Sequence, residues 1–289
     1  MSVNGLRLAA AAMGTRFELV VLDGSGDLRA AGEAALAEIE RWHERLNRFS
    51  PESLLSHINR TAATAPVRLD RDTFDLFRTA LNVWRASHGA FDITVAPLMA
   101  RNGFSDSSVT ALGGHTGSAA IELDPDAWTI RFTSRISLDL GAIGKGYAID
   151  RAAAVLRDCG VESALLHGGT SSVVGIGAPA RQSGWRVAIG SSCTASVIML
   201  RDEALSVSDP GAQASVTGAT HIVDPASGNG AASGGPIAVA GPSCALTDAW
   251  STALVVLRHR VPARGGDATH LPLKYRSITP ESTRERVLA

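Results

Sequence analysis

Two oxygen-bearing side chains near the carboxyl end of the chain could hold a metal ion. Asp248 and Thr252 are four residues apart in an apolar run, residues 246–257, whose pattern predicts a buried helix. Both side chains would then lie on one helical face, where a carboxylate and a hydroxyl can bind a hard cation such as Mg²⁺, with carbonyl oxygens and waters completing its shell. The alternative is structural: an aspartate near the helix start and a threonine that bonds back to a carbonyl.

A second candidate site is the stretch 139–150, in which three glycines surround Lys145. The alternating run 131–138 before it predicts a strand, and the pattern after it predicts a helix. Backbone N–H groups at a strand–helix junction favour an anion, and a lysine adds a charge suited to phosphate. The stretch is not a P-loop, because Gly146 stands where that motif needs Ser or Thr. A glycine-rich structural turn with a solvated lysine is the alternative.

Two histidines and one loop aspartate are further candidates. His221 precedes an Ile-Val pair and an Asp-Pro turn; it could be a general base beside a phosphate site, or a half-buried histidine satisfied by backbone. His167 precedes two glycines and fits either kind of role. Asp92 follows a phenylalanine in a loop and is either a turn or cap residue or a ligand. The chain has no Gly-x-Ser-x-Gly elbow and no His-Glu-x-x-His pair, which disfavours metal-free hydrolase and zinc chemistry.

The elements that must position these residues alternate between helices and antiparallel-looking strands, which indicates an α+β fold. Ser50 and Pro51 look like a helix cap and first residue, opening a short helix that runs to residue 59. The other predicted helices are 28–47 and 70–87, and a loop at 90–98 leads into a further helix. The predicted strands are 13–22, two within 164–177, then 185–189, 196–200, 204–208, 220–223 and 236–240.

Composition narrows the class of protein. The chain has 289 residues, 45% of them hydrophobic, with a formal net charge of −1, which allows a large core and disfavours nucleic-acid or membrane-surface binding. Cys159, Cys193 and Cys244 are too far apart for a metal knuckle or a disulfide framework. Without a basic leader or an 18-residue apolar stretch, we expect a cytoplasmic protein, or a periplasmic one if a signal was removed. Residues 105–120, with an idle His115, predict a surface loop, and the tail 258–289 predicts irregular structure.

Six segments, taken in order, resemble the ApbE family, the FAD:protein FMN transferases. The segments are residues 13–15, 53–59, 91–98, 139–147, 221–228 and 248–252, so the resemblance covers most of the chain before residue 257. It implies one ApbE-like domain at 1–257: a two-lobed α+β globule of mixed or antiparallel sheets with packed helices, T-fold-like, with FAD between the lobes.

The resemblance also implies an activity and a site. Members of this kind take FAD and Mg²⁺ and move the FMN half onto a threonine or serine of a target flavoprotein, releasing AMP. By resemblance, Asp248, Thr252 and backbone oxygens at Ala142 and Ser251 hold the metal, and His221 is the base. The residues placed against FAD are Met13, Ala90, Phe91, Asp92, Asp139, Lys145 and Ile222.

Three departures from the family pattern affect the flavin and acceptor side. Residues 170–172 are Thr-Ser-Ser where the family carries an aspartate after two glycines, and residues 207–210 replace a Thr-Ser-Gly segment. The aromatic residue often found ahead of the Ser-x-Leu segment is expected to be missing, with residues 49–51 forming a shorter stretch. An FAD pyrophosphatase that gives FMN and AMP, or an FAD-binding protein without catalysis, is therefore an alternative to the transferase.

Overall fold

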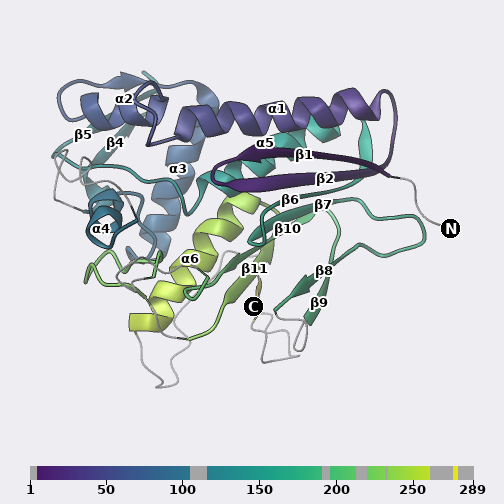
Figure 1. Ribbon diagram of the computed structural model, residues 1–289. Helices are drawn as coiled ribbons and strands as arrows, with labels where there is room; N and C mark the ends of the chain where they lie inside the picture. Colours follow the sequence, from purple (N-terminus) through teal and green to yellow (C-terminus); the bar gives the residue numbers. More distant parts are fainter. Residues whose placement is uncertain are drawn as a thin grey trace.

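The computed structural model describes residues 5–104, 116–190, 196–212, 220–231, 234–260 and 276–278. The protein is an α+β globule in two parts: a large sheet packed against three helices, and a smaller part that contains a three-stranded sheet (Figure 1). One continuous apolar core runs through both parts. None of the helices in the described ranges has the length and apolar character needed to cross a membrane.

The larger part is built on a seven-stranded sheet in the order β1-β2-β6-β7-β10-β11-β12. Each neighbouring pair of strands is antiparallel. The strands are β1 (Leu6–Ala12), β2 (Thr15–Gly24), β6 (Val161–Gly168), β7 (Ser172–Ile176), β10 (Glu203–Ser208), β11 (Ile237–Gly241) and β12 (Arg276–Ile278).

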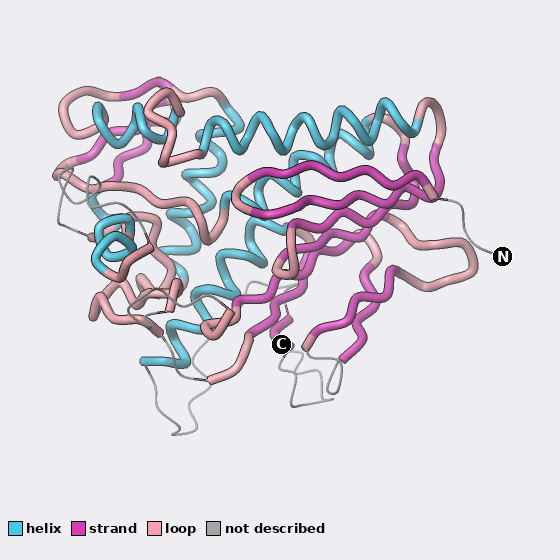
Figure 2. The backbone as a smooth tube through the Cα atoms, in the orientation of Figure 1, coloured by secondary structure: helices cyan, strands magenta, loops and turns pink. Residues whose placement is uncertain are grey.

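Three helices cover one face of this sheet: α1 (Leu28–Leu46), α5 (Gly144–Asp158) and α6 (Cys244–Arg260) (Figures 1 and 2). Helix α5 lies between α1 and α6 and contacts both. The opposite face carries a second apolar cluster that includes Leu205 from β10. The hairpin of β8 (Trp185–Ile189) and β9 (Ser196–Leu200) contributes Ile189 and Leu200 to that cluster. Alternate residues of a strand therefore serve two different cores.

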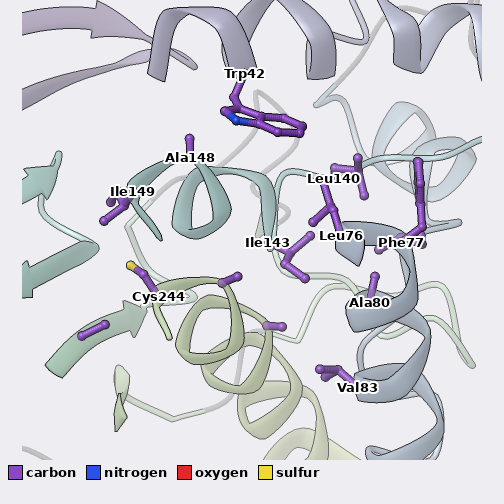
Figure 3. Packing of buried hydrophobic residues seen from close by; sticks show 14 of the residues in the cluster. Trp42, Leu76, Phe77, Ala80, Val83, Leu140, Ile143, Ala148, Ile149 and Cys244 are labelled. Carbon is purple, nitrogen blue, oxygen red and sulfur yellow. The ribbon is translucent and has the colours of Figure 1, made fainter. Parts of the chain in front are cut away.

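The smaller part surrounds the sheet of β3 (Val67–Arg68), β5 (Thr129–Phe132) and β4 (Ile121–Asp124). Its helices are α2 (Leu54–Thr61), α3 (Arg71–Ala86) and α4 (Ala96–Arg101), with a 3₁₀ turn, η2 (Ser118–Ala120). Helix α3 packs against α6, so the two parts share side chains. Figure 3 shows Trp42 of α1, Leu76 and Val83 of α3 and the loop residues Leu140 and Ile143 in this shared core.

The expected α+β fold is confirmed, and so are the helices at 28–47 and 70–87. The predicted cap of the short helix is wrong. Ser53, rather than Ser50, precedes α2, and its hydroxyl accepts the N–H of Ser56 at 3.0 Å. Pro51 lies in the preceding turn. A serine followed by proline satisfies the sequence rule at Ser50, but a free N–H three residues on is what a cap requires, and Ser53 provides that geometry.

Two predicted strands do not form. Strand β5 ends at Phe132, and the backbone of Leu138 instead exchanges two hydrogen bonds with the amide side chain of Asn59, at 2.8 and 3.2 Å. At 220–223, Val223 forms only an isolated bridge with Gly230 of its own turn. In one place a distant side chain and in the other a nearby turn satisfies the backbone, so alternation in the sequence does not lead to a strand in a sheet.

The amino-terminal strand β1 was not predicted, because its run of alanines carries little alternation of apolar and polar residues. The tail was predicted to be irregular, yet α6 continues to Arg260 and β12 pairs with β11. His115, Cys193 and most of the predicted loop at 105–120 lie outside the described residues.

Candidate active site

The loop before α5 is fixed by two apolar anchors. Leu140 and Ile143 are buried between α1 and α3 (Figure 3), and the N–H groups of Ile143 and Gly144 both bond to the carbonyl of Leu140. Ala142, which lies between these two anchors, and Lys145, which follows them in the chain, are half-buried. The apolar anchors thus hold the backbone oxygen of Ala142 and the Lys145 side chain beside the start of a helix.

Gly146 brings α5 against the start of α6. A Cβ at this position would lie 2.2 Å from the carbonyl oxygen of Cys244, so only glycine allows the two backbones to approach this closely. The Gly146 N–H donates to Oδ2 of Asp248 at 2.7 Å. The glycine stretch and the α6 carboxylate, which the sequence presents as separate motifs, are therefore in direct contact.

The Asp248 carboxylate is buried, and the two hydrogen-bond donors that contact it are both uncharged. Besides the Gly146 N–H at Oδ2, the Ser172 hydroxyl donates to Oδ1 at 2.6 Å. Since a carboxylate has about four acceptor positions, two of them are left for a cation. Asp248 is not the cap of α6, because the helix begins at Cys244. The structural alternative of an N-cap is thus not supported.

A layer of hydroxyl groups lies on the same stretch of α6. Ser208 of β10 is 2.7 Å from the Ser251 hydroxyl and 3.2 Å from that of Thr252. The Ser251 hydroxyl donates back to the carbonyl of Asp248 at 3.0 Å. Three hydroxyls are thus gathered within one helical turn of the carboxylate.

This set of donors fits Mg²⁺. The described residues contain no group of three or more His, Cys, Asp and Glu side chains that could hold a metal, so a zinc-type or calcium-type cage is not present there. Mg²⁺ is commonly held by one or two carboxylates, with neutral oxygens, waters and the phosphates of a substrate completing its shell. Asp248, Thr252, Ser251 and the backbone oxygen of Ala142 are the residues that would hold it.

Lys145 is tied to the turn between β6 and β7. Its ammonium group donates to the Ser171 hydroxyl at 2.5 Å. The neighbouring Ser172 contacts Asp248, so two consecutive serines connect the lysine of α5 with the carboxylate of α6. These serines stand in the segment where the sequence departs from the family pattern, and their contacts were not predicted.

The start of α6 is capped from α5. Asp150 accepts hydrogen bonds from the N–H groups of Cys244 and Ala245 at 2.7 and 2.9 Å and from the Ser243 hydroxyl at 2.7 Å. Burial raises the pKa of Asp150 to about 6, although these three donors act in the opposite direction. Asp150 fixes the register of α5 against α6, and the sequence contained no indication of this role.

Asp139 forms a buried ion pair that the sequence did not predict. Its Oδ2 lies 3.3 Å from Nε of Arg48, and its Oδ1 accepts the N–H of Gly141 at 2.7 Å. Phe49, which follows Arg48 in the chain, is 67% exposed, and the Arg48 guanidinium lies 4.4 Å from the centroid of its ring. Phe49 therefore presents an exposed ring ahead of the Ser-x-Leu segment, while the absence of the family's own aromatic residue stays a prediction.

Asp92 is satisfied by its own loop and by η2. Its carboxylate accepts from the N–H and hydroxyl of Thr94 and from the N–H and hydroxyl of Ser118, at 2.7–3.1 Å. Ala90 and Phe91 are almost fully buried. These contacts match the turn-residue alternative for Asp92.

The segment with His221 and Ile222 is held by arginines. Arg260 of α6 bonds to Asp224 at 2.6 Å and to the carbonyl of Gly89 at 3.2 Å. Arg101 of α4 donates to the carbonyl of Gly228 at 2.7 Å. Burial would raise the pKa of Asp224, but Arg260 and the hydrogen bonds from Ala226 and Ser227 together keep that pKa below its ordinary value. Arg260 therefore links the loop before Asp92 to the loop with His221.

The predicted residues thus fall into two linked groups and one separate residue. The residues predicted to hold the cation, called the cation side below, are Ala142, Lys145, Asp248, Ser251 and Thr252 around α5 and α6. The residues predicted to contact FAD, called the flavin side below, are the loops at 90–92 and 221–222 and Asp139, whose N–H donates to the carbonyl of Ile93 at 2.7 Å. The half-buried His221 ring faces the edge of the Phe104 ring at 6.4 Å. Met13 lies in the turn between β1 and β2, and its N–H donates to His43 of α1.

Comparison with known proteins identifies the family. A model of the ApbE family matches residues 13–263. The chain belongs to the ApbE family. Relatives named FAD:protein FMN transferase include one from Vibrio cholerae, 24% identical over 93% of this chain and 86% of its own length, and one from Chlamydia trachomatis, 28% identical over 81% of this chain and 79% of its own length.

Solved ApbE structures have the same fold. The ApbE protein from Thermotoga maritima superposes with a TM-score of 0.79 at 25% identity, covering 89% of this chain and 88% of that protein. The flavin transferase ApbE from Vibrio cholerae gives a TM-score of 0.73 at 22% identity, covering 88% and 87% of the two chains. The likeness to these ApbE proteins thus extends over both parts of the globule.

Proposed function

We propose that this ApbE-family protein catalyses the Mg²⁺-dependent transfer of the FMN half of FAD onto a threonine or serine of a target flavoprotein, with release of AMP. The contact that carries the proposal is the Gly146–Asp248 hydrogen bond, because it places a candidate cation ligand beside the helix start that carries Lys145. A cation together with a lysine is a recurring combination at sites that bind and cleave diphosphates. The family membership and the names of the relatives support the choice of FAD and a protein acceptor.

Each group of residues has a task in this reaction. Lys145 donates to the diphosphate oxygens, where its ammonium group places a positive charge. Asp248 and Thr252 hold the ion, with Ser251 and the oxygen of Ala142. Bound Mg²⁺ supplies positive charge that offsets the charge developing on the diphosphate and on the departing AMP. His221 removes the proton of the acceptor hydroxyl as that oxygen attacks phosphorus.

The flavin side has the task of orienting FAD. FAD is proposed to contact the loop at residues 90–92 together with Asp139 and Ile222, and to contact Met13 in the separate turn between β1 and β2. Phe49 adds an exposed aromatic face on which a planar ring can stack, an interaction worth about 0.5–1.5 kcal/mol beyond area burial. The guanidinium of Arg48 lies over this ring and forms an ion pair with Asp139, and this pair helps to hold the ring in place.

One experiment tests the proposal and separates it from its alternatives. The protein is incubated with FAD and MgCl₂, with and without a flavoprotein subunit that carries a threonine acceptor. Covalent flavin on the acceptor, seen as a fluorescent band after denaturation, together with AMP release, supports transfer. Equal AMP release without the acceptor and no covalent flavin would show a pyrophosphatase. Tight FAD binding with no AMP under any condition would show an FAD-binding protein without catalysis.

Two broader expectations belong to the same proposal. We place the transferase unit at residues 1–257, although the pairing of β12 with β11 adds a strand from the tail to its sheet. The cytoplasm is the proposed compartment; Cys159 and Cys244, the cysteines in the described ranges, are both free. Fractionation of cells that produce the untruncated natural protein would test the compartment.

A further inference from the structure

The helix-facing side of two neighbouring strands carries serines where an apolar surface is expected. Ser206 and Ser208 alternate along β10, and Ser172 of β7 is the cross-strand partner of Ser206. The intervening residues Leu205 and Val207 pack into the apolar cluster on the other face. Alternation places the three serines on one face, between the sheet and α6.

Each of these serines contacts a different residue of α6. Ser206 bonds to the Thr247 hydroxyl at 2.8 Å and Ser172 to Asp248 at 2.6 Å. Ser208 contacts both Ser251 and Thr252. The contacts follow one another along the helix, from its buried first turn to the half-buried side chain of Thr252.

The two serines of β10, Ser206 and Ser208, differ in whether a ligand can reach their hydroxyl oxygens. Ser206 is fully buried, so a ligand does not reach it, although its partner Thr247 donates to the carbonyl of Cys244 at 3.0 Å as Ser251 does to that of Asp248. Ser208 is half-buried and lies between the hydroxyls of the two residues placed at the cation, Ser251 and Thr252. Two serines on one strand therefore have different surroundings. Ser206 has only structural contacts, whereas Ser208 lies among the oxygens that are proposed to bind the cation.

The spacing of these oxygens suits a small octahedral ion. With metal–oxygen bonds of about 2.1 Å, neighbouring ligands of an octahedron are about 3 Å apart. The oxygen of Ser208 is 2.7 Å from that of Ser251 and 3.2 Å from that of Thr252. We propose that Ser208 is a further cation-binding residue, supplying a neutral oxygen from the sheet opposite the ligands of α6. This inference rests on the cation site of the proposed function.

The test compares Ser208 with Ser206 as a matched control. Mg²⁺ binding to the full chain is measured by isothermal titration calorimetry and by the shift in melting temperature, in the wild type, Ser208→Ala, Ser206→Ala and Asp248→Ala. We expect Ser208→Ala to weaken Mg²⁺ binding about tenfold, which corresponds to the loss of about 1.4 kcal/mol. Ser206→Ala should lower the melting temperature without Mg²⁺ while leaving Mg²⁺ affinity unchanged.

A cysteine variant gives a result that a structural role alone would not produce. Ser208→Cys replaces a hard oxygen by a soft sulfur of similar size, so Mg²⁺ should bind more weakly and Cd²⁺ more tightly than in the wild type. Ser206→Cys should show neither change. This variant also keeps the test valid if Ser208→Ala does not fold.

The outcomes separate this inference from the proposed function. If Asp248→Ala abolishes Mg²⁺ binding while Ser208→Ala retains the wild-type affinity within twofold and Ser208→Cys gains no Cd²⁺ preference, Ser208 is not a ligand and the cation site stands. If the wild type itself binds no Mg²⁺, both the inference and the Mg²⁺ part of the proposed function fail.

Discussion

The two sides of the candidate site are built in opposite ways. On the cation side, carboxylates are satisfied by neutral donors of regular elements: Asp248 by Gly146 and Ser172, and Asp150 by the first N–H groups of α6. On the flavin side, two loop carboxylates are held by guanidinium groups, Asp139 by Arg48 and Asp224 by Arg260, while Asp92 meets the neutral donors of Thr94 and Ser118.

The difference fits what each side is proposed to bind. A carboxylate that meets only neutral donors keeps its negative charge for a cation, whereas an arginine there would cancel that charge. Ligands of a small ion must also be placed precisely, which helices and strands achieve better than loops. A flat flavin ring tolerates contacts from loops, provided that these loops are tied together, and a multidentate arginine can link several segments at once.

The largest expected effect comes from removing the cation ligand. Asp248→Ala should lower the rate of AMP release by a factor on the order of 10³ or more, because the charge on the diphosphate loses its counter-ion. Steady-state rates against Mg²⁺ concentration measure this. The fold should survive, with a stability loss of about 1–3 kcal/mol from the unpaired Gly146 and Ser172 donors. Turnover at the wild-type rate would remove Asp248 from the site.

The next effect concerns the proposed base on the flavin side. His221→Ala should slow transfer about 10²–10⁴-fold while FAD affinity, followed by flavin fluorescence, changes little. His221→Gln is the control, since it keeps a polar side chain next to Phe104 without a titratable group. Equal losses of affinity and rate would show that His221 only shapes the pocket.

A smaller effect is expected from removing the arginine that links the two flavin-side loops. Arg260→Met should weaken FAD binding about tenfold, because the Gly89 carbonyl and Asp224 lose their common partner, and change the rate at saturating FAD less. Arg258→Met is a matched control on the same helix, because Arg258 bonds instead to the Gly235 carbonyl. If both variants lose FAD affinity equally, the linking role of Arg260 is wrong.

The smallest effects are opposite pH dependences of stability on the two sides. The folded pKa of Asp150, about 6, is above the ordinary value of 3.8, so the unfolded state gives up this proton first, and the free energy of unfolding falls as pH rises from 3.8 to about 6. The folded pKa of Asp224 is below 3.8, so its contribution is present above that pH and is lost as the pH falls further.

Urea unfolding at a series of pH values checks both signs. Asp150→Asn should flatten the decline between pH 3.8 and about 6. Asp224→Asn should flatten the loss of stability at lower pH and leave the higher range unchanged. Profiles that coincide with that of the wild type would show that neither carboxylate has the environment described above.

The sequence by itself determined the types of groups at the site and most of the helices. Asp248 and Thr252 at helical spacing, the lysine among glycines, and the apolar stripe with Ile39 and Trp42 are local patterns, and helical periodicity is set by neighbours in the chain. The six family-like segments also identified the family, because their residue types and their order can be read without knowledge of any tertiary contact.

Only the tertiary structure decided which polar group meets which. Gly146 and Asp248, Ser172 and Asp248, and Arg260 and Gly89 are far apart in the chain, and nothing local to either partner indicates the other. The same holds for the strand predicted at 131–138, which stops at Phe132 while the distant Asn59 side chain bonds to the backbone of Leu138. Hydrogen bonds between distant segments depend on packing of the whole core, and a sequence pattern records only the part of that packing that repeats along one element.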